Sequence, residues 1–348
     1  MNSFFKAIFL LLSSFLCVAT ATAAQEVVNV YIWANWISPR VVKQFEQETG
    51  IHVNLSTYDS NEILYAKLKA AKNPGYDVIA PSSFYVRRMQ REGLLEKLDK
   101  QRLSNFANLD PHLLDKPYDP ANQYSLPFAW GLTGIFFNDR YYPPGSIKKW
   151  ADLWDEKFRG QLLLLGDPRD VIPIALMALG YSVNDTQPEH LKAAYIKSKA
   201  LMPNVKLFNV DAVTSILIDE DATAGMAWNG DVFRAHQENP HLHLVYPEEG
   251  FVLWLDCLSI AKDAPHTDNA YQFINFILRP DIASSITLDY GFATANALGQ
   301  KRLPPEVRND PVINPPPKVL ERGEVQMDIG DETLAVYEKY WERLKMES

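Results

Sequence analysis

The hydrophobic pattern in the first part of the chain alternates between short apolar runs and amphipathic segments. Residues 27–33 form an apolar run typical of a strand, and residues 39–49 place Val41 and Phe45 at helical spacing. Gly50 is expected to end that helix. A strand, a helix, a strand and a helix are predicted next, at residues 51–56, 61–71, 76–80 and 83–92. This β-α-β-α-β order predicts a largely parallel, doubly wound sheet of the α/β class.

A second unit is predicted to begin near Gly134. The strands predicted after that point are residues 162–165, 223–228, 242–246 and 251–260, and the helices are residues 168–180, 268–278 and 280–288. The proline-rich residues 304–317 cannot form a regular helix or an inner strand, so we expect them to cross the surface. Residues 332–344 predict an amphipathic helix that closes the chain.

The N-terminus has the three parts of a secretory signal peptide. Lys6 precedes an apolar run at residues 7–18, and small residues fill positions 19–24. We therefore predict a signal peptide over residues 1–24, with export to the periplasm. A membrane anchor is the alternative, but the apolar run is short for a bilayer span. A lipid anchor would need a small residue before Cys17, where the chain has Leu16.

Composition narrows the class of protein. The chain has 348 residues, of which 47% are hydrophobic and 22% charged, which is ordinary for a globular protein and favours two domains. It excludes a disordered protein, a coiled coil and a small disulfide scaffold. The formal net charge of −9 makes the chain a poor general binder of nucleic acid or anionic membrane.

The sequence lacks the common catalytic motifs. It contains no phosphate-binding glycine loop, no G-x-S-x-G elbow and no H-E-x-x-H pair. His241 and His243 share one strand face without a third ligand nearby, so we expect structural histidines, no metal and no cofactor. Cys257 is the one cysteine after the leader, and its apolar surroundings predict an inert buried thiol. A ligand-binding protein is favoured over an enzyme, although catalysis by carboxylates has no sequence motif and stays open.

Aromatic and acidic side chains gather where the predicted strands end. In open α/β sheets, ligands bind outside the carboxyl ends of the strands. The residues found there are Trp33, Trp36, Ser82, Phe84, Asp167, Asp170 and Trp228. Tryptophan rings beside carboxylates suit a cation with an alkyl chain, because the rings cover the methylenes and the carboxylates take the charge.

Asp256 is an unusual residue for its strand. Strand alternation puts Trp254 and Asp256 on one face of an apolar run, where an unpaired carboxylate is costly. One interpretation pairs Asp256 with a distant arginine, such as Arg169 or Arg234. The other is that the missing cation is the ligand.

The segment from Asp167 to Asp170 also has two interpretations. Asp167 is expected to cap a helix that has Pro168 at its first position, with Asp170 completing a pattern like a capping box. Alternatively, both carboxylates lie on one face at the strand exit, so that one caps the helix and the other binds ligand.

Ten segments spread over nearly all of the chain after residue 24 carry a family resemblance. They are Trp33-x-x-Trp36 and residues 56–62, 65–69, 76–82, 106–111, 150–154, 225–230, 254–256, 274–280 and 337–341. In these segments the chain resembles the periplasmic spermidine/putrescine-binding proteins of bacterial polyamine ABC importers. The resemblance implies a periplasmic-binding-protein type II fold, in which a hinge joins two doubly wound α/β lobes around a ligand cleft. It implies lobe 1 at residues 25–132 and about 258–310, and lobe 2 at residues 133–257 and about 311–348.

The resemblance also implies a polyamine site. Its matching positions are Trp33, Ser82, Asp167, Asp170, Trp228, Trp254, Asp256 and Gln326. By this analogy the rings of Trp228 and Trp254 stack on the alkyl chain, Asp170 and Asp256 pair with ammonium groups, and Asp167 takes an inner amine. Gln326 and Ser82 add neutral hydrogen bonds.

Several positions depart from the family pattern. Trp36, Phe84 and Phe292 stand where the pattern has tyrosines. Ala34 and Asn35 stand where a hydroxyl and an acidic residue meet the far amine. The lost carboxylate removes a charge-assisted hydrogen bond worth roughly 1.5–3 kcal/mol, which implies a ligand that is shorter or differently spaced than spermidine, or a lower affinity. Asp167 points the other way, because a third carboxylate suits a triamine better than a diamine.

The sequence thus predicts a soluble periplasmic receptor that binds spermidine, putrescine or a close analogue and delivers it to an inner-membrane ABC permease. By resemblance the receptor is a monomer that performs no chemistry. The main alternative is a receptor that signals polyamine through a membrane partner without transport. A receptor for an oxyanion would need arginines and helix N-termini rather than three carboxylates.

Overall fold

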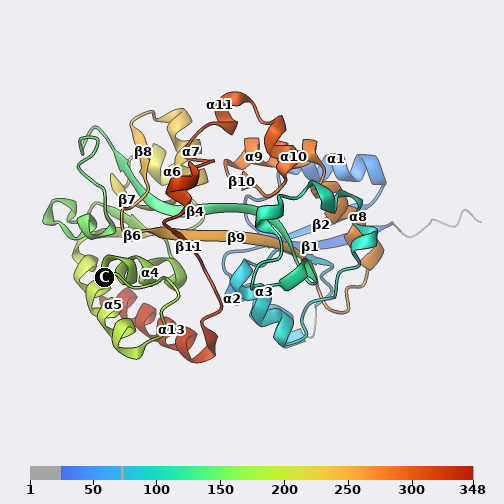
Figure 1. Ribbon diagram of the computed structural model, residues 1–348, viewed down its shortest axis with the longest axis horizontal. Coiled ribbons are helices and arrows are strands. Elements are labelled where there is room, and N and C mark those ends of the chain that lie inside the picture. Colours follow the sequence, from blue (N-terminus) through green and yellow to red (C-terminus); the bar gives the residue numbers. More distant parts are fainter. Residues whose placement is uncertain (1–24, 72–73, 348) are drawn as a thin grey trace, which may run out of the picture.

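The computed structural model describes residues 25–71 and 74–347. The predicted signal peptide, residues 1–24, lies outside them. No helix within the described part of the chain is long and apolar enough to cross a membrane. The molecule has two halves, each with helices around its own strands, and two long strands run through both (Figure 1).

The first half is built from the predicted alternation of strands and helices. Its elements are β1 (Val27–Trp33), α1 (Pro39–Thr49), β2 (His52–Tyr58), α2 (Asn61–Ala71), β3 (Val78–Ile79) and α3 (Ser83–Arg91). Strand β1 pairs in parallel with β2 and with β3, as the alternation predicts. Gly50 ends α1 in the left-handed region at φ 72°, where a side chain would be strained.

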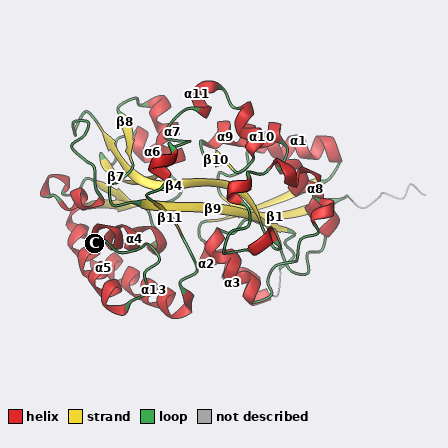
Figure 2. Cartoon of the chain, viewed as in Figure 1, coloured by secondary structure: helices red, strands yellow, loops and turns green. Residues whose placement is uncertain are grey.

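The second half repeats this principle. Its elements are β5 (Leu162–Leu164), α4 (Pro168–Ala178), α5 (Pro188–Leu201), β6 (Val205–Phe208), α6 (Val213–Ile218), β7 (Ala224–Trp228), α7 (Asn229–Glu238) and β8 (Leu242–Val245). Strand β5 pairs in parallel with β6 and β7, and the adjoining helices cover the sheet (Figure 2). The carboxyl ends of the parallel strands in this half meet the cleft described below.

Two long antiparallel strands join the halves, which makes the sheet more mixed than the predicted, largely parallel one. Strands β4 (Leu126–Asn138) and β9 (Phe251–Ile260) pair with each other, and the strand order is β2-β1-β3-β9-β4-β7-β5-β6. Strand β9 matches the strand predicted at residues 251–260, whereas the sequence pattern predicted neither β4 nor the pairing of the two strands. Their register shifts between Pro127 and Ala129, opposite Cys257 and Asp256. Such irregularities re-aim side chains near functional sites.

The C-terminal third of the chain visits both halves. Its elements are α8 (Thr267–Ile277), α9 (Pro280–Tyr290), β10 (Ala293–Thr294), α10 (Ala297–Arg302), α11 (Pro305–Arg308), α12 (Pro317–Leu320), β11 (Gly323–Val325) and α13 (Gly330–Glu347). The proline-rich segment holds one four-residue helix, and a second begins at its last residue; each starts at a proline, where the missing N–H costs nothing. Helices α8 to α10 lie with the first half, whereas α13 packs on α4 and α5 of the second (Figure 1).

The buried apolar residues follow the two halves. One large cluster includes Ala129 of β4 and Trp254 of β9, and another includes Ile135 of β4 and Val252 of β9. Each of the two long strands therefore contributes residues to both hydrophobic clusters. The division into two lobes with the boundaries given above stays a prediction, which we take up under the proposed function.

Candidate functional site

A cleft lies where the two halves meet. It encloses about 920 Å³ including its open mouth, which is in the range of small-molecule sites. All twelve residues that the sequence predicted for the ligand site line it: Trp33, Asn35, Trp36, Ser82, Phe84, Asp167, Asp170, Trp228, Trp254, Asp256, Phe292 and Gln326. The geometry thus brings the predicted residues together, while their role in binding stays a prediction.

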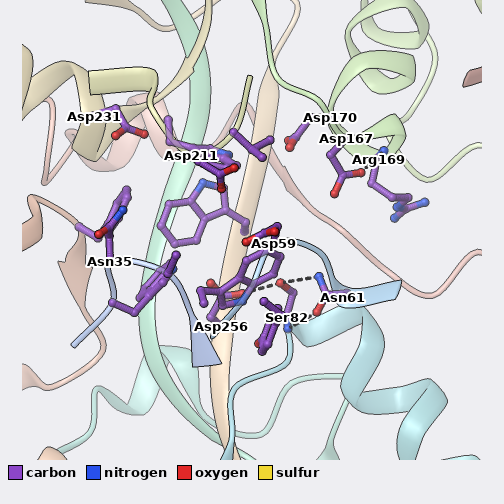
Figure 3. A pocket seen from close by; sticks show the side chains of 18 of the residues that line it. Asn35, Asp59, Asn61, Ser82, Asp167, Arg169, Asp170, Asp211, Asp231 and Asp256 are labelled. Atoms are coloured by element: carbon purple, nitrogen blue, oxygen red, sulfur yellow. Dashed lines mark hydrogen bonds between the residues drawn. The ribbon is translucent and has the colours of Figure 1, made fainter. Parts of the chain in front are cut away.

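Asp256 lies in the floor of the cleft, where β9 passes from one half to the other. Asp256 is 4% exposed, and its carboxylate accepts a hydrogen bond from the Ser82 hydroxyl, with 2.5 Å between Oδ1 and Oγ (Figure 3). Burial raises the pKa of Asp256 to about 7, the Ser82 hydrogen bond acts against this, and nearby Asp170 adds to it.

Among the residues that the structure describes, Asp256 has no arginine partner, so the interpretation that pairs it with Arg169 or Arg234 was wrong. The guanidinium of Arg234 pairs with Asp231 at 2.5 Å, and Nη2 of Arg169 donates to the carbonyl of Met327 at 3.0 Å. Within residues 25–71 and 74–347, no cationic side chain lies within ion-pair distance of Asp256. The carboxylate is held in an apolar strand without a counter-charge, which is costly unless a ligand supplies one.

Asp167 and Asp170 flank the start of α4. Asp167 caps the helix as predicted, because its Oδ1 accepts from the backbone N–H of Arg169 at 2.6 Å. Asp170 does not complete a capping box; its Oδ1 instead accepts from the Thr133 hydroxyl at 3.2 Å. Burial raises the pKa of Asp170 to about 7, and burial with the neighbouring Glu62 and Asp170 carboxylates raises that of Asp167 well above its usual value.

Aromatic rings wall the cleft beside these carboxylates. The indole of Trp254 meets Trp36 and Phe292 edge-on, at centroid distances of 5.6 and 5.2 Å. Gly131 on the neighbouring strand makes this packing possible, since a Cβ there would lie 2.1 Å from Cζ2 of Trp254. The indole N–H groups of Trp33 and Trp254 have no hydrogen-bond partner within the described chain.

The first half also contributes Asn35, at the position where the family pattern has an acidic residue. Its backbone is in the left-handed region at φ 58°, which asparagine tolerates better than most residues. Its side chain lines the cleft (Figure 3) and carries no charge, so the cleft lacks a carboxylate at this position.

The sequence analysis missed several residues of the cleft or gave them another role. They are Ala34, Tyr58, Asp59, Asn61, Arg169, Val210, Asp211, Asp231 and Arg234. Asp59 and Asp211 follow β2 and β6 directly or closely, so the rule that ligands bind at carboxyl ends of strands identifies both positions. Burial and the facing Asp59 raise the pKa of Asp211.

His241, His243 and Cys257 do not line the cleft. The part of the chain that the structure describes holds no group of three or more histidine, cysteine or acidic side chains arranged for a metal ion. His241 and His243 both contact the carboxylate of Asp139, at 2.7 and 2.8 Å. Cys257 is buried beside the Tyr118 hydroxyl, and burial raises the pKa of its thiol.

Comparison with known proteins places the chain in a family. The sequence profile of the bacterial extracellular solute-binding proteins matches residues 40–314. The chain belongs to this family. This solute-binding protein is 44% identical over 315 residues to the spermidine/putrescine-binding periplasmic protein of Salmonella typhimurium, with 90% of each chain covered. It is 41% identical to the spermidine/putrescine-binding periplasmic protein 1 of Haemophilus influenzae, with 94% of this chain and 91% of the relative covered.

Solved structures agree with the family assignment. The solute-binding protein superimposes on a structure from Listeria monocytogenes with a TM-score of 0.90 at 34% identity, covering 93% of this chain and all of the other. The spermidine/putrescine ABC transporter substrate-binding protein of Streptococcus pneumoniae gives a TM-score of 0.79 at 31% identity, covering 92% and 99% of the two chains. The predicted family and the predicted α/β fold of a periplasmic binding protein are therefore confirmed.

Proposed function

We propose that the protein is a periplasmic receptor for a protonated polyamine of the spermidine and putrescine class, which it delivers to an inner-membrane ABC permease. The observation that carries this proposal is the set of buried carboxylates Asp167, Asp170 and Asp256, none of which forms an ion pair within residues 25–71 and 74–347. The nearby charge of Arg169 acts against the raised pKa values of Asp167 and Asp170 without offsetting their burial. Relatives that align over at least nine-tenths of the chain are named for the same ligands, which supports it. The proposal involves no chemical turnover.

The carboxylates and the rings have separate tasks in this proposal. Asp170 and Asp256 take ammonium groups of the ligand, and Asp167 takes a further amine with the carboxylate oxygen that the helix cap leaves free. The rings of Trp228 and Trp254 cover the methylenes, whose burial is favourable by roughly 0.8 kcal/mol each. A polyamine satisfies both demands because its charges are separated by apolar segments.

Neutral groups complete the site. The amide nitrogen of Gln326 donates to the carbonyl of Arg169 at 2.6 Å, so its oxygen is left to accept from an ammonium group. The Ser82 hydroxyl already donates its one proton to Asp256, so it can only accept from the ligand. The amide oxygen of Gln326 and the Ser82 hydroxyl can therefore each accept from a donor such as a protonated amine.

Closure of two lobes is part of the same proposal. Lobe 1 would comprise residues 25–132 and about 258–310, and lobe 2 residues 133–257 and about 311–348. Two ion pairs join α3 to the segment around the start of α13, with Arg91 3.0 Å from Asp328 and Arg88 2.9 Å from Asp331. These pairs support a closed arrangement that excludes water from the cleft.

Binding is tested on refolded protein, because polyamine retained from the cell would mask added ligand. The protein without its leader is titrated by calorimetry with putrescine, spermidine, norspermidine and spermine. Ligand at 100 times its Kd should stabilise the fold by about 2.7 kcal/mol and raise Tm by several degrees. We expect heat of binding and a raised Tm with at least one polyamine. If none of the four polyamines gives either signal, the ligand assignment is refuted.

Delivery needs a separate test in cells. A strain that lacks the gene should take up less labelled polyamine, and the Asp256→Asn variant should not restore uptake. Normal uptake in the deletion strain would instead favour a sensing role, in which the receptor reports polyamine to a membrane partner.

A further inference from the structure

The amide of Asn61 holds the Ser82 residue from two sides. Asn61 is the first residue of α2, is 3% exposed and lines the cleft. Its Oδ1 accepts from the backbone N–H of Ser82 at 3.0 Å, and its Nδ2 donates to the Ser82 hydroxyl at 3.0 Å (Figure 3). The orientation of the amide follows from chemistry, since a backbone N–H is only a donor and must face the amide oxygen.

This arrangement fixes where the Ser82 proton points. The hydroxyl oxygen accepts from Nδ2 of Asn61, so its own proton is directed to another acceptor. That acceptor is Oδ1 of Asp256, 2.5 Å away. The three side chains form a chain of hydrogen bonds with one direction, and each bond strengthens the next.

We propose that Asn61 is a positioning residue for charge recognition: through Ser82, it holds Asp256 as an ionised acceptor for a ligand ammonium group. The inference rests on the proposed function and deepens it. Asn61 itself need not touch the ligand. It sets the polarity of the hydroxyl that lies beside the carboxylate.

A helix-capping role does not account for the Asn61 side chain. Ser60 caps the start of α2, because its hydroxyl accepts from the backbone N–H of Ile63 at 3.3 Å. Ser82 stands at the N-cap of α3, yet its side chain makes no capping bond. The Asn61 side chain is therefore bonded to Ser82, and the Ser82 hydroxyl to Asp256, rather than to the first turns of their own helices.

No charged group that the structure describes near Asp256 favours its ionised form. The titratable groups that face it are Tyr58 of β2, Asp170 of α4 and the adjacent Cys257. The Tyr58 hydroxyl donates to the carbonyl of Ala80, and the other two are acidic or neutral. Among the contacts that the structure describes, the hydrogen bond from the Ser82 hydroxyl is thus the one that favours the ionised form of Asp256.

A double-mutant cycle tests whether Asn61 acts through Ser82. Calorimetry with spermidine and putrescine compares the unmodified protein with Asn61→Ala, Ser82→Ala and the double variant. We expect each single change to weaken binding about 3- to 10-fold. The double variant should lose little more than one single variant, since the two changes break the same chain of hydrogen bonds. Losses that multiply would overturn the inference.

A ligand-free measurement keeps the inference testable by itself. Carboxyl-carbon NMR follows the titration of Asp256, which is assigned by its loss in Asp256→Asn. The midpoint should move to higher pH in Asn61→Ala. It should also move up in Asn61→Asp, which still accepts from the Ser82 N–H but draws the hydroxyl proton away from Asp256. An unchanged midpoint in both would overturn the inference, whatever ligand the protein binds.

Asn269→Ala is the matched control. This buried asparagine lies in the same half of the molecule and makes two hydrogen bonds, to Glu26 and to the carbonyl of Val27, away from the cleft. It should lower Tm and change neither the affinity nor the Asp256 midpoint. If the unmodified protein binds no polyamine, the proposed function fails, and the NMR titration still decides the role of Asn61.

Discussion

Replacing Asp256 by asparagine should have two opposite effects. The substitution keeps the shape of the side chain and removes its charge. The ligand-free protein should become more stable, because burial without a counter-charge raises the pKa of Asp256 from 3.8 to about 7. The polyamine complex should become weaker, because an ammonium group loses its charged partner.

The effect on stability has a definite pH dependence. The folded state binds the Asp256 proton more tightly than the unfolded state, so between pH 4 and 7 this group makes the protein less stable as pH rises. A difference of about 3 pKa units corresponds to at most about 4 kcal/mol above pH 7. Asp256→Asn should therefore raise the ligand-free Tm at pH 8, by up to about 10 °C, and change it little at pH 4.

The effect on binding is measured at the same pH values. Loss of a charge-assisted hydrogen bond worth roughly 1.5–3 kcal/mol should weaken polyamine binding about 10- to 150-fold at pH 8. Asp221→Asn is the control, because Asp221 is exposed and lies outside the cleft. Unchanged affinity in Asp256→Asn would refute the binding role, and a Tm difference that does not vary with pH would refute the argument from burial.

Three further outcomes are expected. Polyamine affinity should fall as pH drops below about 7, because burial raises the pKa values of Asp170 and Asp256 to about 7 and their protons compete with the ligand. Calorimetry in buffers of different ionisation enthalpy measures the protons that are taken up when ligand leaves. An affinity that stays constant from pH 5 to 8 contradicts this prediction. Asn35→Asp should strengthen spermidine binding by up to about 10- to 150-fold by restoring a carboxylate, and a titration showing no gain would remove Asn35 from the ligand's far end. Gly131→Ala should weaken binding at least 10-fold while far-ultraviolet circular dichroism stays unchanged, because its Cβ would displace the Trp254 ring; wild-type affinity would show that the ring position is unimportant.

The sequence predicted the elements with strong local signals. The first half has helices at Pro39–Thr49 and Asn61–Ala71 and a strand at Val27–Trp33, as the periodicity and Gly50 indicated. It did not predict β4, because Pro127 and two glycines interrupt the apolar run and the strand is stabilised by pairing with distant β9. Whether a strand pairs across the molecule depends on tertiary contacts that local pattern does not contain.

The candidate site also has residues that the sequence predicted and residues that it did not. The tryptophans and carboxylates at strand ends could be named from the sequence, since residue type and position both pointed to them. Asn61 could not, because its proposed role depends on its amide reaching Ser82, 21 residues away, and on the carboxylate of Asp256 on β9. That no arginine of the described residues pairs with Asp256 was equally out of reach, because only the fold shows Arg169 bonded to the Met327 carbonyl and Arg234 to Asp231.

The two long strands β4 and β9 determine which parts of the site move when the lobes close. If the lobes close as proposed, the bending is concentrated where these two strands pass from one half to the other, and a residue at that point moves least. Asp256 lies on β9 at the crossing, whereas Asp59 and Asp211 come from opposite halves at the exposed ends of their strands. A ligand would be anchored first by a carboxylate that is already in place in the open receptor. Asp59 and Asp211 lie farther from this point and would reach the ligand only as the lobes close. Binding of the ligand and its enclosure would then be successive steps.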